Sequence, residues 1–527
     1  MKSALVPLVS ILILTSLAFG QSTEPLPTFE AADVHSSPRV TNPVTRGGFV
    51  RGGRYEFKQA TMLDLIANAY NLEADKVLGG PSWLETDRFD ILAKAPASAN
   101  NDTAKLMLRA LLADRFKLAV HNEDRPTSVY ALTALTQRGP QLKESSGGGQ
   151  IGCQGIPQNA APGVIPYSVV ACRNLPMDAI ATALRQMAGG YFDQPIVDLT
   201  GLKGNWDFEL KWTGRNQLAA AGPDGISAFD AIEKQLGLKA ELQKKPGPVV
   251  VVDRVNQKPT DNLPDVAKSL PATPTEFEVG DLKPSMPGVQ QRGGIQPGGR
   301  IDAQGFTLKN LMSMAWDLQA DMLIGPKWIE TDKFNLVAKA PADVIAGGNL
   351  DVISLQGMLK ALLIDRFKIK MHNEDRPVAV FALIAPKKET KLKKADPTAR
   401  ASCKRLVATP AGSSIPLATV TCQNTTMAQL AEKLQGWAGA YVTHPAVDLT
   451  GIEGGWDFSF SWTPLANFNA APRPEAAQQP GAAVAAEPNG ALTLFEGLER
   501  LGLKLEQQKH PLPVLVIDEA SQDPTEN

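Results

Sequence analysis

The sequence lacks an excess of charge of either sign, and this excludes one broad class of partner. Its 53 lysine and arginine residues are balanced by 55 aspartate and glutamate residues, so the formal net charge at pH 7 is −2. Proteins that bind nucleic acids or anionic membrane surfaces use an excess of basic residues to attract phosphate groups. We therefore predict no nucleic-acid partner.

Sequence motifs for catalysis and metal binding are also missing. The chain has five histidines, and none belongs to an HExxH zinc-peptidase motif. It contains neither a GxSxG nucleophile motif nor a phosphate-binding loop that ends in Lys-Ser/Thr. We therefore predict no catalytic residue, no metal site and no cofactor, and we favour a protein without enzymatic activity.

Long apolar runs are absent except at the N-terminus. Residues 4–18 form an apolar run that follows Lys2 and ends at the small residues Ala18 and Gly20. This pattern is typical of a secretory signal peptide, and we predict that residues 1–20 are removed. The run is shorter than the ~20 residues of a membrane-spanning helix, although an uncleaved anchor is the alternative. We expect a periplasmic or secreted protein with no membrane span after cleavage.

Blocks of sequence recur in the same order, which indicates a tandem repeat. Each block returns about 250 residues later with few substitutions. The clearest pairs are GPSWLETDRFDILAKAP with GPKWIETDKFNLVAKAP, ALLADRFKLAVHNEDRP with ALLIDRFKIKMHNEDRP, and VDLTGLKGNWDF with VDLTGIEGGWDF. A chain of 527 residues also exceeds one ordinary domain of ~100 to 200 residues.

The repeat divides the chain into two domains. We predict a first repeat domain at residues 24–254 and a second at 276–520. Residues 255–275 are rich in proline and polar residues, which is typical of a linker of limited flexibility. In the second domain, an Ala/Pro-rich stretch at about 466–490 has no apolar periodicity, and we predict a disordered insertion there.

The four cysteines follow the repeat. Cys153 and Cys172 are 19 residues apart, and so are Cys403 and Cys422. In an oxidising compartment this spacing predicts one disulfide in each domain, with a contribution of ~3 kcal/mol to stability. A zinc site is the alternative, but no CxxC motif or pair of histidines lies nearby.

Within each copy a weaker duplication indicates an α+β fold. Each half reads as strand, amphipathic helix, strand, helix and two closing strands, with helices packed on small mixed sheets. Thr61 is the predicted N-cap of the first helix, with Asp64 three residues on. Three helices show apolar residues at helical spacing: Met62, Leu65, Ile66 and Ala69; Met177, Ile180, Ala181 and Leu184; Met427, Leu430, Ala431 and Leu434.

The closing strands of each half are predicted to form β-hairpins. In the first domain these strands are residues 117–124 with 128–135, and 238–244 with 248–253. Gly237, just before the second pair, is a predicted helix C-cap.

The repeated motifs resemble those of the soil-associated family of uncharacterised bacterial secreted proteins. GPxWxxTDxF, ALLxDRFKxxxHNEDRP, VDLTGxxGxWDF and LGLKxExQK carry the resemblance across both copies nearly end to end. The family is a domain of unknown function, so the resemblance implies no activity. Some relatives are fused to a membrane metallopeptidase of the antibiotic-sensor type, which implies an extracellular sensing or binding domain. This chain lacks the several membrane helices and the HExxH motif of that arrangement.

Each half also resembles a second kind of domain, the short N-terminal domain of secretins and TonB-dependent receptors. That domain is a protein-docking module. The resemblance concerns the order of strands and helices only, and it implies that a protein partner docks on the chain.

One charged cluster is a candidate binding or catalytic site. It occurs once in each copy: His121, Glu123, Asp124 and Arg125; His372, Glu374, Asp375 and Arg376. A strand places His121 and Glu123 on one face, as acid–base or metal chemistry requires. Because Pro126 follows and no second histidine is near, we prefer a charged strand end and turn with internal ion pairs.

Two further pairs of residues are candidate binding residues. Arg54 and Arg300 end the glycine-rich segments RGGR and PGGR. We interpret both segments as flexible loops in preference to an anion site, and the two arginines are the first candidates for an anion contact if one exists. Trp83 and Trp328 lie just after a Gly-Pro turn. Core packing is the preferred interpretation for them, and contact with a peptide or sugar is the alternative.

Three functional hypotheses follow. The leading one is an exported binding or sensing module that docks an envelope or extracellular protein through exposed sheet edges, with two copies raising the effective affinity. The second is an envelope hydrolase that uses the sites of His121 and His372. The third is a structural protein of the cell envelope.

Overall fold

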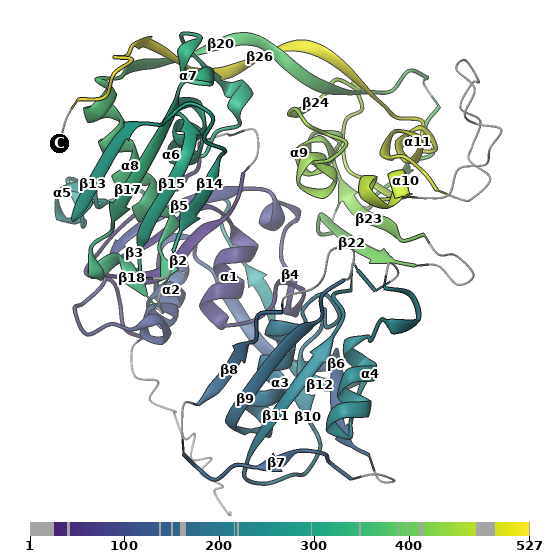
Figure 1. Ribbon diagram of the computed structural model, residues 1–527. Coiled ribbons are helices and arrows are strands. Elements are labelled where there is room, and N and C mark those ends of the chain that lie inside the picture. The colour runs from purple at the N-terminus through teal and green to yellow at the C-terminus, as the bar shows by residue number, and fades with distance from the viewer. Residues whose placement is uncertain are drawn as a thin grey trace, which may run out of the picture.

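The computed structural model describes residues 26–525, apart from residues 39, 41–42, 136–138, 149–150, 159–164, 216, 219–220, 297, 347–348, 388, 398, 410–414 and 471–490. Each repeat consists of two α/β halves that are joined by a long two-stranded ribbon (Figure 1). The fold is therefore α+β in two tandem domains, as the sequence predicts. Residues 1–20, the predicted signal peptide, lie outside the described residues.

The first half of the first repeat packs two helices on an antiparallel sheet of order β1-β5-β3-β2. Its apolar core lies between the sheet and the helices. The elements of this half are β1 (Ala31–Ser36), β2 (Arg46–Arg51), β3 (Arg54–Thr61), α1 (Met62–Tyr70), β4 (Val77–Gly79), β5 (Arg88–Lys94) and α2 (Asn101–Arg115).

The second half repeats this plan with a sheet of order β7-β11-β9-β8 and its own core. Strands β3 and β9, β4 and β10, and β5 and β11 occupy equivalent places in the two halves. The elements are β7 (Lys143–Glu144), β8 (Gly152–Gly155), β9 (Ser168–Pro176), α3 (Met177–Met187), β10 (Ile196–Asp198), β11 (Asn205–Trp212) and α4 (Ala228–Ala231).

Strands β6 (Ala119–Ala134) and β12 (Leu238–Arg254) form the ribbon and exchange their ends between the halves. The end of β12 pairs in parallel with β4 of the first half, and the end of β6 pairs in parallel with β10 of the second half. Val250 and Val252 of β12 are buried in the core of the first half. Each half is therefore completed by the last strand of the other.

The predicted hairpins are wrong, because each predicted pair is one continuous strand. Pro126 lies opposite Pro246 in the middle of the ribbon. The N–H of Tyr130 in β6 donates to the carbonyl of Pro195, in the loop before β10, and so points away from β12. Backbone N–H groups alternate along a strand, so the backbone nitrogen of Pro126 also points away from β12. A proline is tolerated there because no ladder hydrogen bond is lost.

The second repeat has the same plan. Its ribbon, β20 (Lys370–Ile384) with β26 (Lys504–Glu519), arches over the two halves in Figure 1. The first half contains β13 (Val279–Pro284), β14 (Arg292–Ile295), β15 (Arg300–Thr307), α6 (Leu308–Trp316), β16 (Leu323–Ile324), α7 (Trp328–Thr331), β17 (Lys333–Lys339), β18 (Ile345–Ala346), β19 (Asn349–Leu350) and α8 (Val352–Phe367).

The second half of this repeat includes the predicted disordered insertion. Its first residues form α10, and residues 471–490 lie outside the described part of the chain. The elements are β21 (Lys393–Lys394), β22 (Ser402–Ala408), β23 (Leu417–Thr425), α9 (Met427–Ala438), β24 (Ala446–Asp448), β25 (Trp456–Trp462), α10 (Leu465–Ala470) and α11 (Leu494–Glu499).

Local sequence signals for the helices are confirmed. Thr61 caps α1, and Asp64 returns the hydrogen bond, which completes a capping box. Gly237 ends the helical segment after α4 with a φ of 66°, a conformation that favours glycine. The apolar residues predicted to face the core are buried in all three helices.

Both disulfides are confirmed, and both tie an edge strand to its neighbour. Cys153 of β8 lies opposite Cys172 of β9, and Cys403 of β22 lies opposite Cys422 of β23. Each disulfide therefore holds the outer strand of a second-half sheet. No helix in the described residues is long and apolar enough to cross a membrane.

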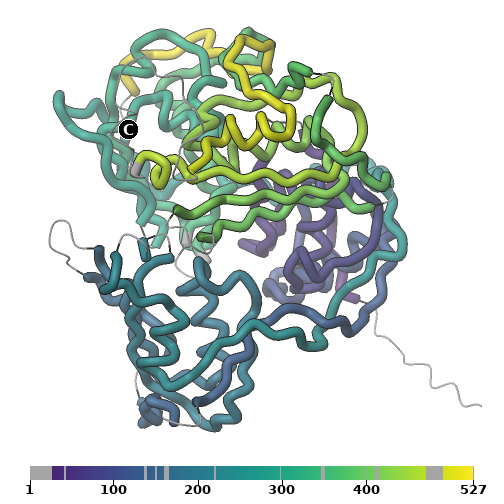
Figure 2. Tube along the Cα trace, turned by 90° about the vertical axis from the view of Figure 1, so that its right-hand side faces the viewer, coloured from purple at the N-terminus to yellow at the C-terminus, as the bar shows by residue number. Residues whose placement is uncertain are grey.

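The linker is bound to the first repeat. The Arg115 guanidinium donates to Thr260 and Asn262, and helix α5 (Val266–Ser269) follows. The second repeat, teal to yellow in Figure 2, lies against the first half of the first repeat. Charged pairs join the two repeats: Arg46 with Asp317, Arg400 with Glu85, and Arg88 with Glu432.

Candidate functional site

The charged cluster predicted from the sequence forms an exposed row along the ribbon. The His121 Nδ1 atom lies 2.8 Å from Asp253, and its Nε2 atom lies 3.4 Å from Glu123. The Arg125 guanidinium donates to Glu123. About half of the His121 side chain (49%) is exposed. The internal ion pairs are as predicted, but they lie in mid-strand and no turn follows.

The second repeat contains the same row. His372 Nδ1 lies 2.9 Å from Asp518, and its Nε2 atom is 3.7 Å from Glu374. The Arg376 guanidinium donates to Glu374. The same ion pairs therefore occur at equivalent positions of both ribbons.

Hydrogen bonds shift the protonation of this row towards its charged forms. The hydrogen bond to Asp253, and then that to Glu123, raises the pKa of His121 above its usual value. The hydrogen bond from Arg125 lowers the pKa of Glu123. Asp518 raises the pKa of His372 in the same way. In each row the neighbouring carboxylates therefore favour the protonated imidazole, as in an ion pair.

The glycine-rich segment before Arg54 is a tight turn and not a flexible loop. Arg51 pairs with Arg54 across Gly52 and Gly53, whose φ angles are 51° and 74°. Positive φ at both central residues is the requirement of the hairpin turn that joins β2 to β3. Gly52 of this turn lines a cavity together with Asp343 and Asp351 of the second repeat.

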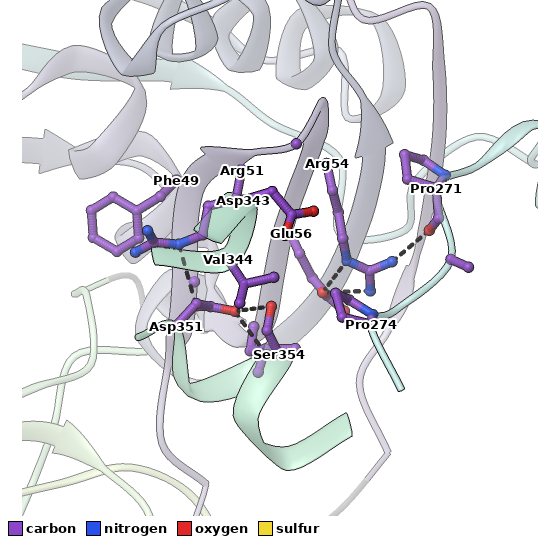
Figure 3. A pocket seen from close by; sticks show the side chains of 14 residues that line it. Phe49, Arg51, Arg54, Glu56, Pro271, Pro274, Asp343, Val344, Asp351 and Ser354 are labelled. Atoms are coloured by element: carbon purple, nitrogen blue, oxygen red, sulfur yellow. Dashed lines mark hydrogen bonds and ion pairs between the residues drawn. The ribbon is translucent and has the colours of Figure 1, made fainter. Parts of the chain in front are cut away.

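The Arg54 side chain is buried and already has partners. Its guanidinium donates to Glu56 at 2.5 and 2.8 Å and to the linker at Pro271 O and Thr273 Oγ1, as Figure 3 shows in part. Arg300, its sequence counterpart, is 60% exposed and 3.9 Å from Asp302. The two arginines thus occupy different environments despite their matching positions.

A small cavity lies beside Arg54, where both repeats and the linker meet. Its volume is about 80 Å³, and Arg51, Glu56, Asp343 and Asp351 are among its lining residues (Figure 3). Ligand pockets usually measure ~300 to 1,000 Å³. This cavity is therefore a joint between the repeats and too small for an organic ligand.

The two candidate tryptophans pack on the cores of the first halves. Trp83 is partly buried, and its ring lies 6.4 Å from that of Phe89. Trp328 is also partly buried, with its ring 6.2 Å from that of Phe367. Both tryptophans therefore contact core residues, as the preferred interpretation of core packing predicts.

A larger groove, which the sequence did not reveal, lies at the centre of the first repeat. It has a volume of about 730 Å³ and runs between α1, the ribbon and α3. We call it the ribbon groove. Its apolar lining residues are Ala67, Leu72, Val129, Pro195, Val197, Pro246 and Pro248, and its charged ones are Glu73, Lys76, Lys105, Arg185 and Lys245.

Two hydrogen bonds fix side chains that line the ribbon groove. Arg185 Nη1 of α3 donates to Glu73 Oε1 at 2.9 Å, which joins the two halves of the repeat. Lys105 Nζ donates to Asn71 Oδ1 at 2.9 Å. Within the described residues, no carboxylate lies within ion-pairing distance of Lys245.

The same place in the second repeat is closed by apolar side chains. Met322 stands where the first repeat has Lys76, and it is buried with Val378, Val380, Val514 and Val516. Gln319 donates to Gln435, where the first repeat pairs Glu73 with Arg185. A signal for the groove was present in the sequence at positions where the two copies differ.

The fold and its sites define a class of protein: a disulfide-bonded α+β tandem repeat with strand-exchanged halves. The chain belongs to the family described as protein of unknown function (DUF3738), whose model matches residues 63–255 and 309–520. The two matches coincide with the two repeats. No curated protein and no solved structure is significantly similar to the chain.

Within the described residues, no group of three or more His, Cys, Asp or Glu side chains has the geometry of a metal site. The row around His121 is included in that statement. The charged candidates from the sequence therefore differ in kind from the ribbon groove, which combines volume, cations and apolar surface.

Proposed function

We propose that the protein is an exported, non-catalytic binding module that docks a protein partner in the ribbon groove of its first repeat. One observation supports this most directly. The groove of about 730 Å³ contains four basic side chains over an apolar floor, whereas in the second repeat Met322 replaces Lys76, Val378 replaces Thr127, and both pack in an apolar cluster. The two repeats share a scaffold, so the difference points to a role of the first groove.

The free-energy cost of burying Lys76 in the groove supports the same proposal. Lys76 is 9% exposed, and holding an ammonium group away from water costs free energy unless its partners compensate. Met322 shows that this position accepts an apolar side chain that packs instead. A charged residue in place of a packing residue is expected where binding requires it.

The edges of the ribbon disfavour docking by strand addition. Pro126, Pro246 and Pro248 face outward at the centre of the ribbon and offer no N–H to an added strand. Strand addition at the centre of the ribbon is therefore disfavoured, and we propose that the partner contacts side chains in the groove.

Export is supported by the two disulfides, because disulfides persist in oxidising compartments. The apolar run at residues 4–18 supports a secretory signal peptide. We place the protein in the periplasm or outside the cell. The resemblance to sensing and docking domains agrees with a binding role.

A pair of substitutions tests the docking site. Lys76→Met with Arg185→Gln gives the first groove two residues of the second repeat, those at Met322 and Gln435. We expect this variant to fold with a Tm close to that of the wild type and to lose a partner that the wild-type chain captures from envelope extracts. Binding is quantified with the purified partner by calorimetry.

A control variant removes the same number of charges elsewhere. Lys234→Gln with Lys268→Gln changes two side chains that are 70% and 79% exposed and do not line the groove. It should bind as the wild type does. Equal binding by the groove variant and the wild type would contradict the proposal.

A further inference from the structure

The ribbon groove continues beyond the first repeat. A second cavity, of about 650 Å³, shares Glu73, Arg185 and Pro195 with it. The far side of this cavity is formed by the second repeat, through Lys404, Arg405 and other residues of β22 and β23. The two cavities therefore form one track that crosses from the first repeat to the second.

Basic side chains outnumber acidic ones along the track. The basic residues are Lys76, Lys105, Arg185, Lys245, Lys404 and Arg405, and the acidic residues are Glu73, Asp75 and Asp193. Asp75 is paired with Lys76, and Glu73 with Arg185. Lys404 and Arg405 are exposed on an edge strand. The track attracts anions although the whole chain has a net charge of −2.

Glu73 shows what kind of anion fits. Its carboxylate lies 2.9 Å from the Arg185 guanidinium at the point where the two cavities meet. The residues described along the track include no aromatic side chain, so the track has no surface on which a nucleobase or sugar ring stacks. Carboxylates fit the cations, and aliphatic side chains fit the apolar residues such as Leu72, Val129 and Leu406.

We propose that the track binds an extended acidic peptide segment in which aliphatic side chains are interspersed among carboxylates. This inference rests on the proposed function and names the chemistry of the partner. The basic residues come from five separate elements in both repeats, so a single small anion cannot reach all of them. An extended chain advances ~3.3 Å per residue and can contact them in succession.

The test uses the full-length chain and three labelled twelve-residue peptides, with repeating Glu-Glu-Leu, Gln-Gln-Leu or Lys-Lys-Leu units. Affinity is measured by fluorescence anisotropy at low and moderate salt. We expect the Glu peptide to bind at least tenfold more tightly than the other two, and its binding to weaken as salt rises. Equal binding of the Glu and Gln peptides would overturn the inference.

Variants test both ends of the track. Lys105→Gln with Lys245→Gln in the first repeat, and Lys404→Gln with Arg405→Gln in the second, should each weaken the Glu peptide at least tenfold. Lys234→Gln with Lys268→Gln should leave its affinity unchanged. If only the first-repeat variant has an effect, the continuous track is wrong.

The outcomes also separate this inference from the proposed function. If the Gln peptide binds, the Glu peptide does not, and Lys76→Met with Arg185→Gln abolishes the binding, the groove is a docking site and the acidic ligand is wrong. If no peptide binds but the captured partner still depends on the groove, the inference fails and the proposed function stands.

Discussion

Lys76 illustrates how one side chain distinguishes the two repeats. The Lys76 side chain is only 11% exposed, and its ammonium group lies 2.9 Å from the Asp75 carboxylate. In the second repeat Met322 lies at this place among valines. The same backbone therefore supports a polar groove in one copy and a packed apolar cluster in the other. Residues that both repeats share build the fold, and residues that differ mark the candidate site.

His121 and His372 give a prediction for pH dependence. Because the pKa of each imidazole is raised in the folded chain, mainly by Asp253 and Asp518, each contributes stability that is complete below the unfolded pKa of ~6.5. That contribution is lost as the pH rises through the folded pKa. We expect NMR titration to give both imidazoles a pKa above 6.5.

The matched variant is Asp253→Asn. Loss of the carboxylate should move the pKa of His121 down towards 6.5 and leave that of His372 unchanged. A His121 pKa at or below 6.5 in the wild type would show that the Asp253 pair does not form in solution.

Elements differ in how far sequence alone predicts them. The helix α1 follows from a local pattern, since Thr61, Asp64 and the apolar stripe all lie within ten residues. Strands β6 and β12 pair with each other although they lie more than a hundred residues apart. Pro126 suggested a turn because its pairing with Pro246 could not be seen in the sequence. The ribbon groove was missed for the same reason, because its lining comes from α1, α2, α3 and the ribbon.

The disulfides at the edges of the second-half sheets predict equal effects in the two repeats. Cys153→Ala with Cys172→Ala, or Cys403→Ala with Cys422→Ala, should each lower the free energy of unfolding by ~3 kcal/mol, because each disulfide closes a loop of similar length in the unfolded chain. Denaturant unfolding measures the loss. The wild type under reducing conditions should match the variant that lacks both pairs, and an unchanged midpoint would contradict the expectation.

Pro126 and Pro246 lack an N–H at the free edges of the ribbon, and we expect them to prevent self-association of the chain through these edges. Pro126→Val with Pro246→Val adds two outward N–H groups to free strand edges, so we expect concentration-dependent association in sedimentation experiments. The control, Ser128→Val, adds a β-branched side chain at a position that already has its N–H. If the double variant stays in the same state as the wild type at all concentrations, the prolines do not protect the edge.

At the scale of the whole molecule, the two repeats are joined at several separate places. The linker is fixed by Arg54 and Arg115, and the ion pair of Arg46 with Asp317 joins the first halves. The pair of Arg400 with Glu85 joins the first repeat to the second half of the second. These contacts set the position of β22 next to the ribbon groove, so the track between the repeats depends on them.

Strand exchange predicts which fragments fold. A fragment of residues 26–135 lacks β12, whose Val250 and Val252 are buried in the core of the first half. We expect this fragment to show no cooperative thermal transition by circular dichroism. A fragment of residues 26–270 contains both halves and should unfold cooperatively. A cooperative transition in the shorter fragment would show that the half folds without the exchanged strand.

The exchanged ribbon also sets an order of events during biosynthesis. The half that leaves the ribosome first waits for residues 250–252, which are made last in its repeat, before its apolar core closes. Such distant pairings form slowly and leave apolar surface open in the meantime. We therefore expect a nascent chain of this design to stay loosely folded until its whole repeat has been made.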